Sequence, residues 1–546
     1  MADAVPWRRL AVPWRRLAGP LAGLLVVLVI GLPLARLVGV ALEDGPAVLA
    51  ATLAGPLVAG AIGNSLWTGV LVALVAAGAG TAAALATERS ALPGRRWLRL
   101  GLLLPMLVPP FVTAFGWARA FGPRGLTDQL VGVTLPGLYG PLGIVVVLTV
   151  AATPLAYLVV AGALASRVEP DLERAARASG AGRLETFRTI TLPLLRPAIL
   201  SALVVVFVFA VNAFGVPTVL GTPAGFATIT TRLYQDLALS AEPAAFVRAA
   251  TMAAMLVVLA LIVVGSADAL LAGRGVVRTG LPAGGEAGHA GGRVAAALMT
   301  GAIVVTTIVP LVALVLSALT RAVGLPPVPA NWTLANFGEA LDARFADGLI
   351  HSVVLATAAA TLVLVLGGLV AIATRRGSTV LGTAVTLGFA IPGSALAVAV
   401  LLAYGGWLRD SLAIILVAYL AKFWALGHRQ LAGSLDRLPP DLLRAARASG
   451  AGSLDAIRSV VVPILRPSIA AGWLVVFVFA LHELTMSSLL YGPGSATLAV
   501  VVLNVQQLGD PTVSAALAVL LTVIVAIAAA PLAILGGRRA RTRRAG

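Results

Sequence analysis

The sequence predicts an all-α integral membrane protein of about twelve transmembrane helices, arranged as two parallel six-helix repeats. Three observations predict this fold. Of the 546 residues, 59% are hydrophobic and only 11% are charged, whereas soluble domains carry roughly 25% charged residues. Apolar runs of about 20 residues, long enough to cross a bilayer as helices, recur along the chain. Residues 171–200 and 441–470 align without a gap at an offset of 270, with 18 of 30 positions identical.

The apolar runs define the expected spans, numbered here in chain order. They lie near 21–42, 62–87, 98–117, 142–165, 198–220, 247–272, 294–320, 352–373, 380–404, 411–433, 468–491 and 513–535. Membrane helices tolerate proline, so Pro105, Pro109, Pro110, Pro154 and Pro392 are expected inside continuous spans. The first span is longer than the apolar core of a signal peptide, and we expect it to remain as an uncleaved helix.

The positive charges predict the orientation. If the N-terminus is cytoplasmic and the spans alternate, 31 of the 39 Lys and Arg residues fall in inside segments, as the positive-inside rule requires. Both termini are then cytoplasmic, in a bacterial inner membrane. The net charge of +17 follows from this topology, with contact to anionic membrane lipids, and indicates no nucleic-acid partner. The absence of cysteine excludes disulfides, zinc–cysteine sites and thiol catalysis.

The chain divides into two halves, 1–272 and 294–546, joined by the Gly-rich cytoplasmic linker 273–293. Six spans is an even number, so both halves have the same orientation and are related by an axis along the membrane normal. Two further pairs support the duplication, because Asn64-Ser65 opens span 2 and His351-Ser352 opens span 8.

The duplicated loops, 167–197 and 434–467, are each predicted to form a rigid helix–turn–helix on the cytoplasmic surface. Proline suits the first turn of a helix. A short helix with a face of small residues is therefore expected to begin at Pro170 in the first loop and at Pro440 in the second.

Glycine is expected to end this short helix in both loops, at Gly180 and at Gly450, where a left-handed residue is commonly found. A second short helix, 183–190 or 453–460, is expected to follow. It should stop before the next proline, because the residue before a proline leaves the helical region.

This loop resembles the EAA loop of ABC importer permeases. The resemblance rests on an Ala-Ala pair four residues before a glycine, followed by a proline before the penultimate span of each half. It implies that the loops are coupling helices that dock on two copies of a cytoplasmic ATPase. The candidate coupling residues are Arg174, Ala175, Ala176, Gly180, Arg444, Ala445, Ala446 and Gly450. Arginine stands at 174 and 444 where the family has glutamate, so that role falls to another group, with Glu173 a candidate in one half only.

The chain itself contains no ATPase motif. A phosphate-binding loop needs a lysine in a glycine-rich pattern, and the single lysine, Lys422, has no such neighbours. Four scattered histidines show no metal-site spacing. We therefore expect a transport subunit rather than an enzyme, with no cofactor of its own. A separate chain is expected to hydrolyse ATP, and the resemblance implies an extracytoplasmic binding protein that delivers the substrate.

Ionisable residues in an apolar span are functional candidates. Span 11 places His482 and Glu483 inside an apolar helix, and the aligned position in span 5 holds Asn212. Two interpretations remain open. These residues line a translocation path that tolerates a cation, or they are packed by hydrogen bonds between helices.

Two fused six-span halves resemble the ferric-iron branch of these permeases, which has thiamine, phosphonate and polyamine permeases as neighbours. The resemblance rests on residues 214–226, 230–234, 331–337, 391–393 and 483–491. It implies ferric iron as the substrate. The alternative of another class is a 6 + 6 secondary transporter driven by an ion gradient.

Overall fold

The computed structural model describes residues 13–90, 92–167, 170–271, 290–375 and 378–542. Within them the chain is helical, with one isolated antiparallel bridge between Thr320 and Trp332. Ten helices are long and apolar enough to cross a membrane, and two bent helix pairs bring the number to 12. The predicted all-α membrane fold is therefore confirmed.

Short π- or 3-10-helical turns, labelled η, interrupt the α-helices. The first half contains α1 (Pro13–Val26), η2 (Val27–Gly31), α2 (Leu32–Leu42), α3 (Gly45–Ala54), α4 (Pro56–Arg89), α5 (Arg95–Leu103), η3 (Leu104–Leu107), α6 (Pro110–Phe121), α7 (Leu126–Val131), α8 (Pro141–Arg167), α9 (Pro170–Ala178), α10 (Arg183–Thr186), η4 (Phe187–Thr191), α11 (Leu192–Val211), α12 (Gly215–Leu220), η5 (Thr222–Ala224), α13 (Ile229–Tyr234), η6 (Gln235–Leu239) and α14 (Pro243–Leu271). The second half contains α15 (Ala290–Ile303), η7 (Val304–Ile308), α16 (Val309–Leu319), η8 (Pro329–Asn331), α17 (Ala335–Ala340), α18 (Ala343–Thr374), α19 (Thr379–Ala390), α20 (Gly393–Leu408), α21 (Leu412–Asp436), α22 (Pro440–Ala448), α23 (Ser453–Ala456), η9 (Ile457–Val461), α24 (Val462–Leu481), α25 (Thr485–Leu490), α26 (Leu498–Gln507) and α27 (Pro511–Thr542).

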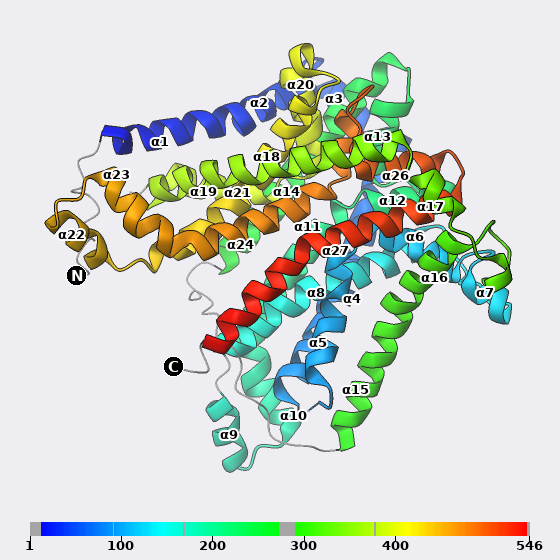
Figure 1. Cartoon of the computed structure of the whole chain (residues 1–546), viewed down its shortest axis with the longest axis horizontal. Coiled ribbons are helices and arrows are strands. Elements are labelled where there is room, and N and C mark those ends of the chain that lie inside the picture. Colours follow the sequence, from blue (N-terminus) through cyan, green and yellow to red (C-terminus); the bar gives the residue numbers. More distant parts are fainter. Residues whose placement is uncertain (1–12, 91, 168–169, 272–289, 376–377, 543–546) are drawn as a thin grey trace.

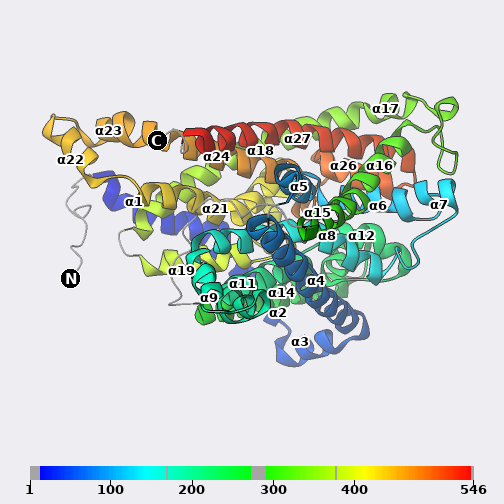
Figure 2. The ribbon, with the colours of Figure 1, turned by 90° about the horizontal axis from the view of Figure 1, so that it is seen from below.

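The duplication seen in the sequence is also a duplication of structure. Every element from α9 to α12 has an equivalent from α22 to α25, and both bounds of each pair differ by 270 residues. The short helices of the two copies, α9–α10 and α22–α23, lie at the ends of separate arms of the molecule (Figure 1, Figure 2).

Hydrogen bonds near the opposite ends of the spans are duplicated as well. The Ser65 hydroxyl accepts the backbone N–H of Ile229 at 2.8 Å, and the Ser352 hydroxyl accepts that of Leu498 at 2.9 Å. The preceding residue contacts a backbone carbonyl in both halves, Asn64 that of Ala227 and His351 that of Ala496, each at 2.9 Å. The two polar pairs found in the sequence therefore fix equivalent loops in the two halves.

Spans 3 and 9 are broken, which corrects the expectation of continuous helices there. Span 3 divides into Arg95–Leu107 and Pro110–Val131, bent by 105°, and span 9 into Thr379–Gly388 and Gly393–Leu408, bent by 113°. A steric clash disfavours the helical region for a residue that precedes a proline, and both breaks fall at such residues. Val108, Pro109 and Ile391 each precede a proline and have extended backbones, with ψ of 125°, 135° and 128°. Pro154, in contrast, lies inside the unbroken α8, as expected.

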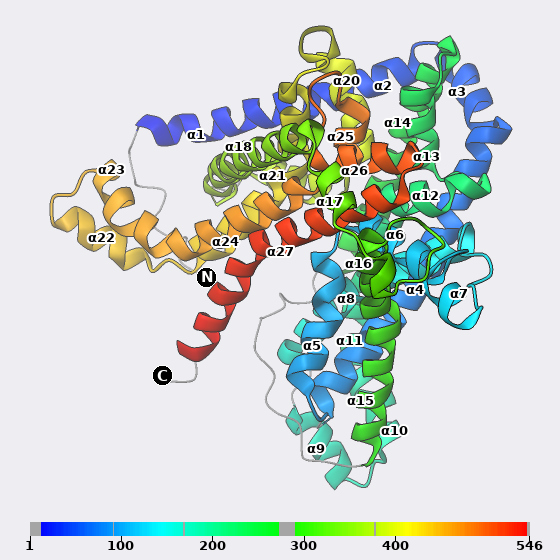
Figure 3. The ribbon, with the colours of Figure 1, turned by 45° about the vertical axis from the view of Figure 1, so that its right-hand side comes forward.

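The first span of each half packs on the opposite half (Figure 1, Figure 3). In the first half, α1 packs against α18 and α2 against α20. In the second half, α15 packs against α5 and α16 against α6. The two halves are thus interlocked through their exchanged first spans.

An aromatic hydrogen bond secures each exchanged span at its π-helical turn. The Tyr404 hydroxyl donates to the Leu28 carbonyl in η2 at 2.5 Å, and the Trp117 indole donates to the Thr306 carbonyl in η7 at 3.1 Å. A helical N–H five or four residues later would normally bond to these carbonyls. Those positions hold Pro33 and Pro310, which have no N–H. The opposite half therefore supplies the hydrogen bond that each proline cannot make.

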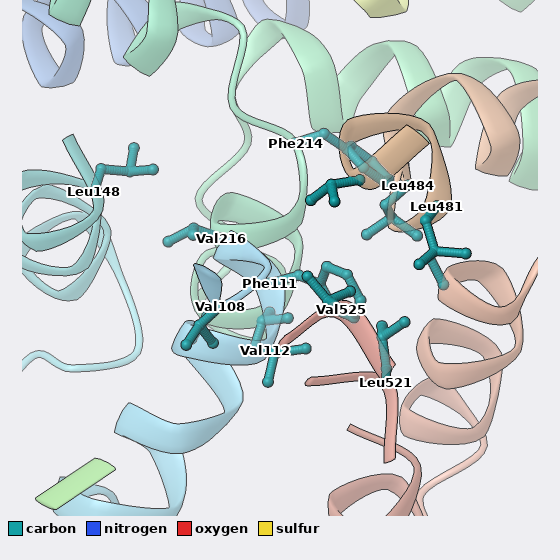
Figure 4. Close-up of a cluster of buried hydrophobic side chains, with 14 of the residues drawn as sticks. Val108, Phe111, Val112, Leu148, Phe214, Val216, Leu481, Leu484, Leu521 and Val525 are labelled. Atoms are coloured by element: carbon teal, nitrogen blue, oxygen red, sulfur yellow. The ribbon is translucent and has the colours of Figure 1, made fainter. Parts of the chain in front are cut away.

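The centre of the molecule is apolar and joins the interrupted helices. Figure 4 shows Phe111 after the break of span 3, next to Val525 of α27 and near Leu484, which precedes α25. A Cβ added to Gly215 would lie 2.5 Å from the Phe111 Cβ and 3.3 Å from Leu484. Broken segments of both halves therefore meet in close contact.

Candidate functional site

The two duplicated loops form the first candidate site, and we call them the first hairpin (170–190) and the second hairpin (440–460). In the first hairpin, the N–H of Ala181 donates to the Ala176 carbonyl at 3.0 Å, and that of Gly180 donates to the Arg177 carbonyl at 3.1 Å. This pair of bonds is a Schellman motif, which satisfies carbonyls at a helix end. The second hairpin repeats the bond that spans five residues, since the N–H of Ala451 donates to the Ala446 carbonyl at 3.0 Å.

The predicted left-handed glycines are confirmed. Gly180 has a φ of +93° and Gly450 a φ of +80°. A Cβ at either position would meet nothing within 4 Å. The requirement for glycine therefore comes from the backbone conformation, which an L side chain rarely adopts, and not from lack of space.

The prediction of a separate second short helix, ending before Pro193 or Pro463, was wrong. In the first hairpin, α10 continues through η4 into α11, and Arg183–Val211 is one helix long enough to span a membrane. Pro193 occupies the second position of α11, after the π-helical turn. A π turn shifts the hydrogen-bond register by one residue, so a residue without an N–H is accommodated there. The first hairpin is consequently joined to the span by continuous helix, without an intervening loop.

The candidate coupling residues lie on exposed surfaces. Arg174 forms an exposed ion pair with Asp171, at 2.9 Å. Ala175 and Ala445 are exposed, whereas Ala176 and Ala446 are half-buried against the rest of the hairpin. The backbone of Arg444 is helical, but its side chain lies outside the described residues.

His482 and Glu483, the candidate path residues, do not lie inside a helix, which corrects their expected position within span 11. Span 11 ends at Leu481, and both residues occupy the break before α25. The Glu483 carboxylate accepts the backbone N–H groups of Met486, at 2.9 and 3.0 Å, and Ser487, at 3.1 Å. Glu483 therefore caps the N-terminus of α25, where a negative charge is favourable.

The first half lacks this cap and has one fewer N–H group to be capped. The position that matches Glu483 holds Ala213, and the position that matches Ser487 holds Pro217, which has no N–H to cap. Asn212, also at a helix end, lines a small apolar cavity between α11 and α14. The polar residues at the equivalent helix ends therefore differ in their contacts, since Glu483 caps a helix and Asn212 lines a cavity.

Lys422 of α21 bonds to the backbone where span 9 is broken, a role that the sequence did not reveal. Its ammonium donates to the Ile391 carbonyl at 2.8 Å, where span 9 is interrupted. Close by on the same helix, the Tyr419 hydroxyl bonds to the hydroxyl of Ser487, whose backbone N–H is capped by Glu483, at 2.7 Å. In the first half, position 152 is alanine at the offset of 270. The only available signal was this loss of symmetry, a lysine in one copy alone.

No group of three or more His, Asp or Glu side chains that could hold a metal ion occurs in the part of the chain that the structure describes. Residues 69–274 and 363–540 match the family "Binding-protein-dependent transport system inner membrane component". The chain belongs to this family and is an inner-membrane permease of an ABC-type transport system. Membership implies a substrate-binding protein and an ATPase as partners.

Similar proteins include two that match along most of the chain. The ferric transport system permease protein FbpB of Actinobacillus pleuropneumoniae is 27% identical over 488 residues, covering 85% of this chain and 69% of the relative. The Fe(3+)-transport system permease protein FbpB 2 of Haemophilus influenzae is 25% identical, covering 88% and 91%. A probable molybdenum ABC transporter permease of Haloferax volcanii is 34% identical, but over only 36% of this chain and 70% of the relative.

Proposed function

We propose that this permease imports ferric iron, received from an extracytoplasmic binding protein and driven by two copies of a separate ATPase. The duplicated hairpin supports the proposal of two ATPase copies. One chain presents two hairpins whose helices have the same lengths and differ in position by 270 residues. For iron, the support is the extent of the match. The two relatives named for ferric transport cover at least 85% of this chain, whereas the molybdenum relative covers 36%.

The proposed orientation places the hairpins and both termini in the cytoplasm. Both hairpins lie at the ends of the two arms, away from α7 and α17 (Figure 1, Figure 3). The opposite side carries loops 118–141, 221–246, 321–350 and 491–512, on which we expect the binding protein to dock. We expect that protein, not the permease, to hold iron through oxygen ligands.

In this mechanism, nucleotide binding draws the two ATPase copies together and moves the hairpins. Because α10, η4 and α11 form one continuous helix, the movement reaches the membrane centre without an intervening loop. There the broken spans and capped half-helices reorient as rigid bodies, which exchanges inward-facing and outward-facing states.

Uptake by reconstituted vesicles tests this function. The vesicles contain the permease and its ATPase, with the hairpins facing the interior. A binding protein loaded with radioactive ferric iron is added outside. The vesicles should accumulate iron only when ATP is present inside. Molybdate, thiamine, putrescine and a phosphonate serve as competing cargoes. Accumulation of one of these instead of iron would assign the permease to that substrate, and uptake driven by a proton or sodium gradient would contradict the proposal as a whole.

A further inference from the structure

Glu173 of α9 is a buried carboxylate in an otherwise exposed hairpin. Only 8% of the residue is exposed. Its carboxylate accepts the Thr191 hydroxyl at 2.7 Å, in η4, and lies 3.5 Å from the Arg89 guanidinium at the end of α4. One side chain therefore joins the hairpin helix, the π-helical turn and the end of span 2.

The second hairpin replaces this polar arrangement by an apolar one. At the offset of 270, Glu173 corresponds to Leu443 and Thr191 to Val461. Val461 packs with Ala446 against the buried residues Leu438 and Ala456. Both partners of the hydrogen bond have changed together, to residue types that cannot form it.

The residue before Arg89 forms ion pairs with the first part of the broken span 3. Glu88, its neighbour, is buried and pairs with Arg95 at 2.8 Å and with Arg99, both on α5. The Tyr157 hydroxyl of α8 also donates to Glu88, at 3.3 Å. From α5 the chain runs through η3 to the break at Val108. The neighbouring residues Glu88 and Arg89 at the end of α4 thus form ion pairs with two different elements, Arg89 with the first hairpin and Glu88 with α5, which leads to the break in span 3.

We propose that Glu173 is the positioning residue that links the first hairpin to α4 and, through it, to broken span 3. The second hairpin has leucine in place of Glu173, and it transmits its movement through the packing of Ala446 and Val461 and through its continuous helix. The two halves of the permease are consequently coupled to the ATPase by different means, and the first half depends on one buried carboxylate. This inference rests on the proposed docking of the ATPase on the hairpins.

Tryptic cleavage of the purified permease measures the link without any partner. The first hairpin offers exposed arginines at 174, 183 and 188. Glu173→Gln removes the charge that faces Arg89, and charged hydrogen bonds hold local structure strongly, so cleavage there should become roughly tenfold to a hundredfold faster. Asp171→Asn is the matched control on the same helix, because its ion pair with Arg174 is exposed and should leave the cleavage rate unchanged.

A double variant separates transmission from local folding. Glu173→Leu with Thr191→Val gives the first hairpin the apolar pair of the second, so cleavage should stay close to the wild-type rate. The link to Arg89 is lost, and we expect the reconstituted system to hydrolyse severalfold more ATP per iron imported. Wild-type stoichiometry in this variant, or unchanged cleavage in Glu173→Gln, would overturn the proposal.

Cross-linking distinguishes a failure of this inference from a failure of the proposed function. Cysteine placed at the exposed position Ala175 should cross-link to the ATPase in the complex. If it does not, the hairpin is not the docking element and the proposed function is at fault. If it cross-links while the stoichiometry of the double variant is normal, docking holds and the transmitting role of Glu173 is wrong.

Discussion

Gly180 and Gly450 each have a left-handed φ that sets the turn of its hairpin. Both have left-handed φ values in open space. Gly182, two residues further on, has an ordinary φ of −67° and equally open surroundings. The pair 180 and 182 therefore allows conformation to be tested separately from side-chain volume.

Replacing Gly180 and Gly450 together by valine should impair transport. The left-handed conformation costs an L residue about 1–2 kcal/mol, so the Schellman turns should open and ATP-dependent uptake should fall, with membrane insertion unchanged. Uptake and membrane-fraction yield are measured side by side, with Gly182→Ala as the control that should behave as wild type. Normal uptake by the double variant would mean that the turns play no part in coupling.

Glu483 allows its capping role to be tested against a role in the path. Glu483→Gln retains an oxygen acceptor for Met486 and Ser487, so thermal stability should stay near wild type, whereas Glu483→Leu should cost about 1–3 kcal/mol by leaving buried N–H groups unsatisfied. Thermal unfolding in detergent measures both. If Glu483→Gln is stable but imports no iron, the charge acts on the substrate, and capping alone is an insufficient account.

At the scale of the elements, the exchanged first spans depend on one aromatic donor each. Trp117→Phe and Tyr404→Phe remove the hydrogen bonds to the carbonyls that Pro310 and Pro33 leave unpaired. Each should lower the stability by about 0.5–1.5 kcal/mol. Thermal unfolding is again the measurement. Trp67→Phe is the control, because the indole N–H of this exposed residue makes only a long 3.5 Å hydrogen bond and a phenyl ring keeps an aromatic partner for Phe226. Equal loss in all three variants would show that the effect is not specific to the π-helical turns.

The sequence predicted the elements better than their interruptions. Span positions follow from local apolar length, and the hairpin glycines from local turn chemistry, so both could be predicted. The breaks at Pro109 and Pro392 could not be distinguished from the tolerated Pro154, because the difference depends on neighbouring helices that receive the bent backbone. Lys422 and Glu483 were separated by 61 residues of sequence, and nothing local indicated that both serve helix ends at one place.

At the scale of the whole molecule, the chain should be inert without its partners. Its lysine is bonded to the Ile391 carbonyl and has no phosphate-binding loop around it. Vesicles that contain the permease alone should hydrolyse no ATP and accumulate no iron under an imposed proton or sodium gradient. Adding the ATPase and the binding protein should restore inward transport. Iron flux in the lone permease would show that the closed apolar centre leaks or that the energy source is a gradient.

The exchanged first spans also dictate an order of assembly during synthesis. The first span is synthesised well before its partners α18 and α20, which end at Thr374 and Leu408. Until they are inserted, the Leu28 carbonyl has no Tyr404 to bond with, and an unsatisfied carbonyl is costly in lipid. The nascent first half therefore cannot complete its own fold. We expect its first helix to remain without these partners until α20 has been synthesised and inserted.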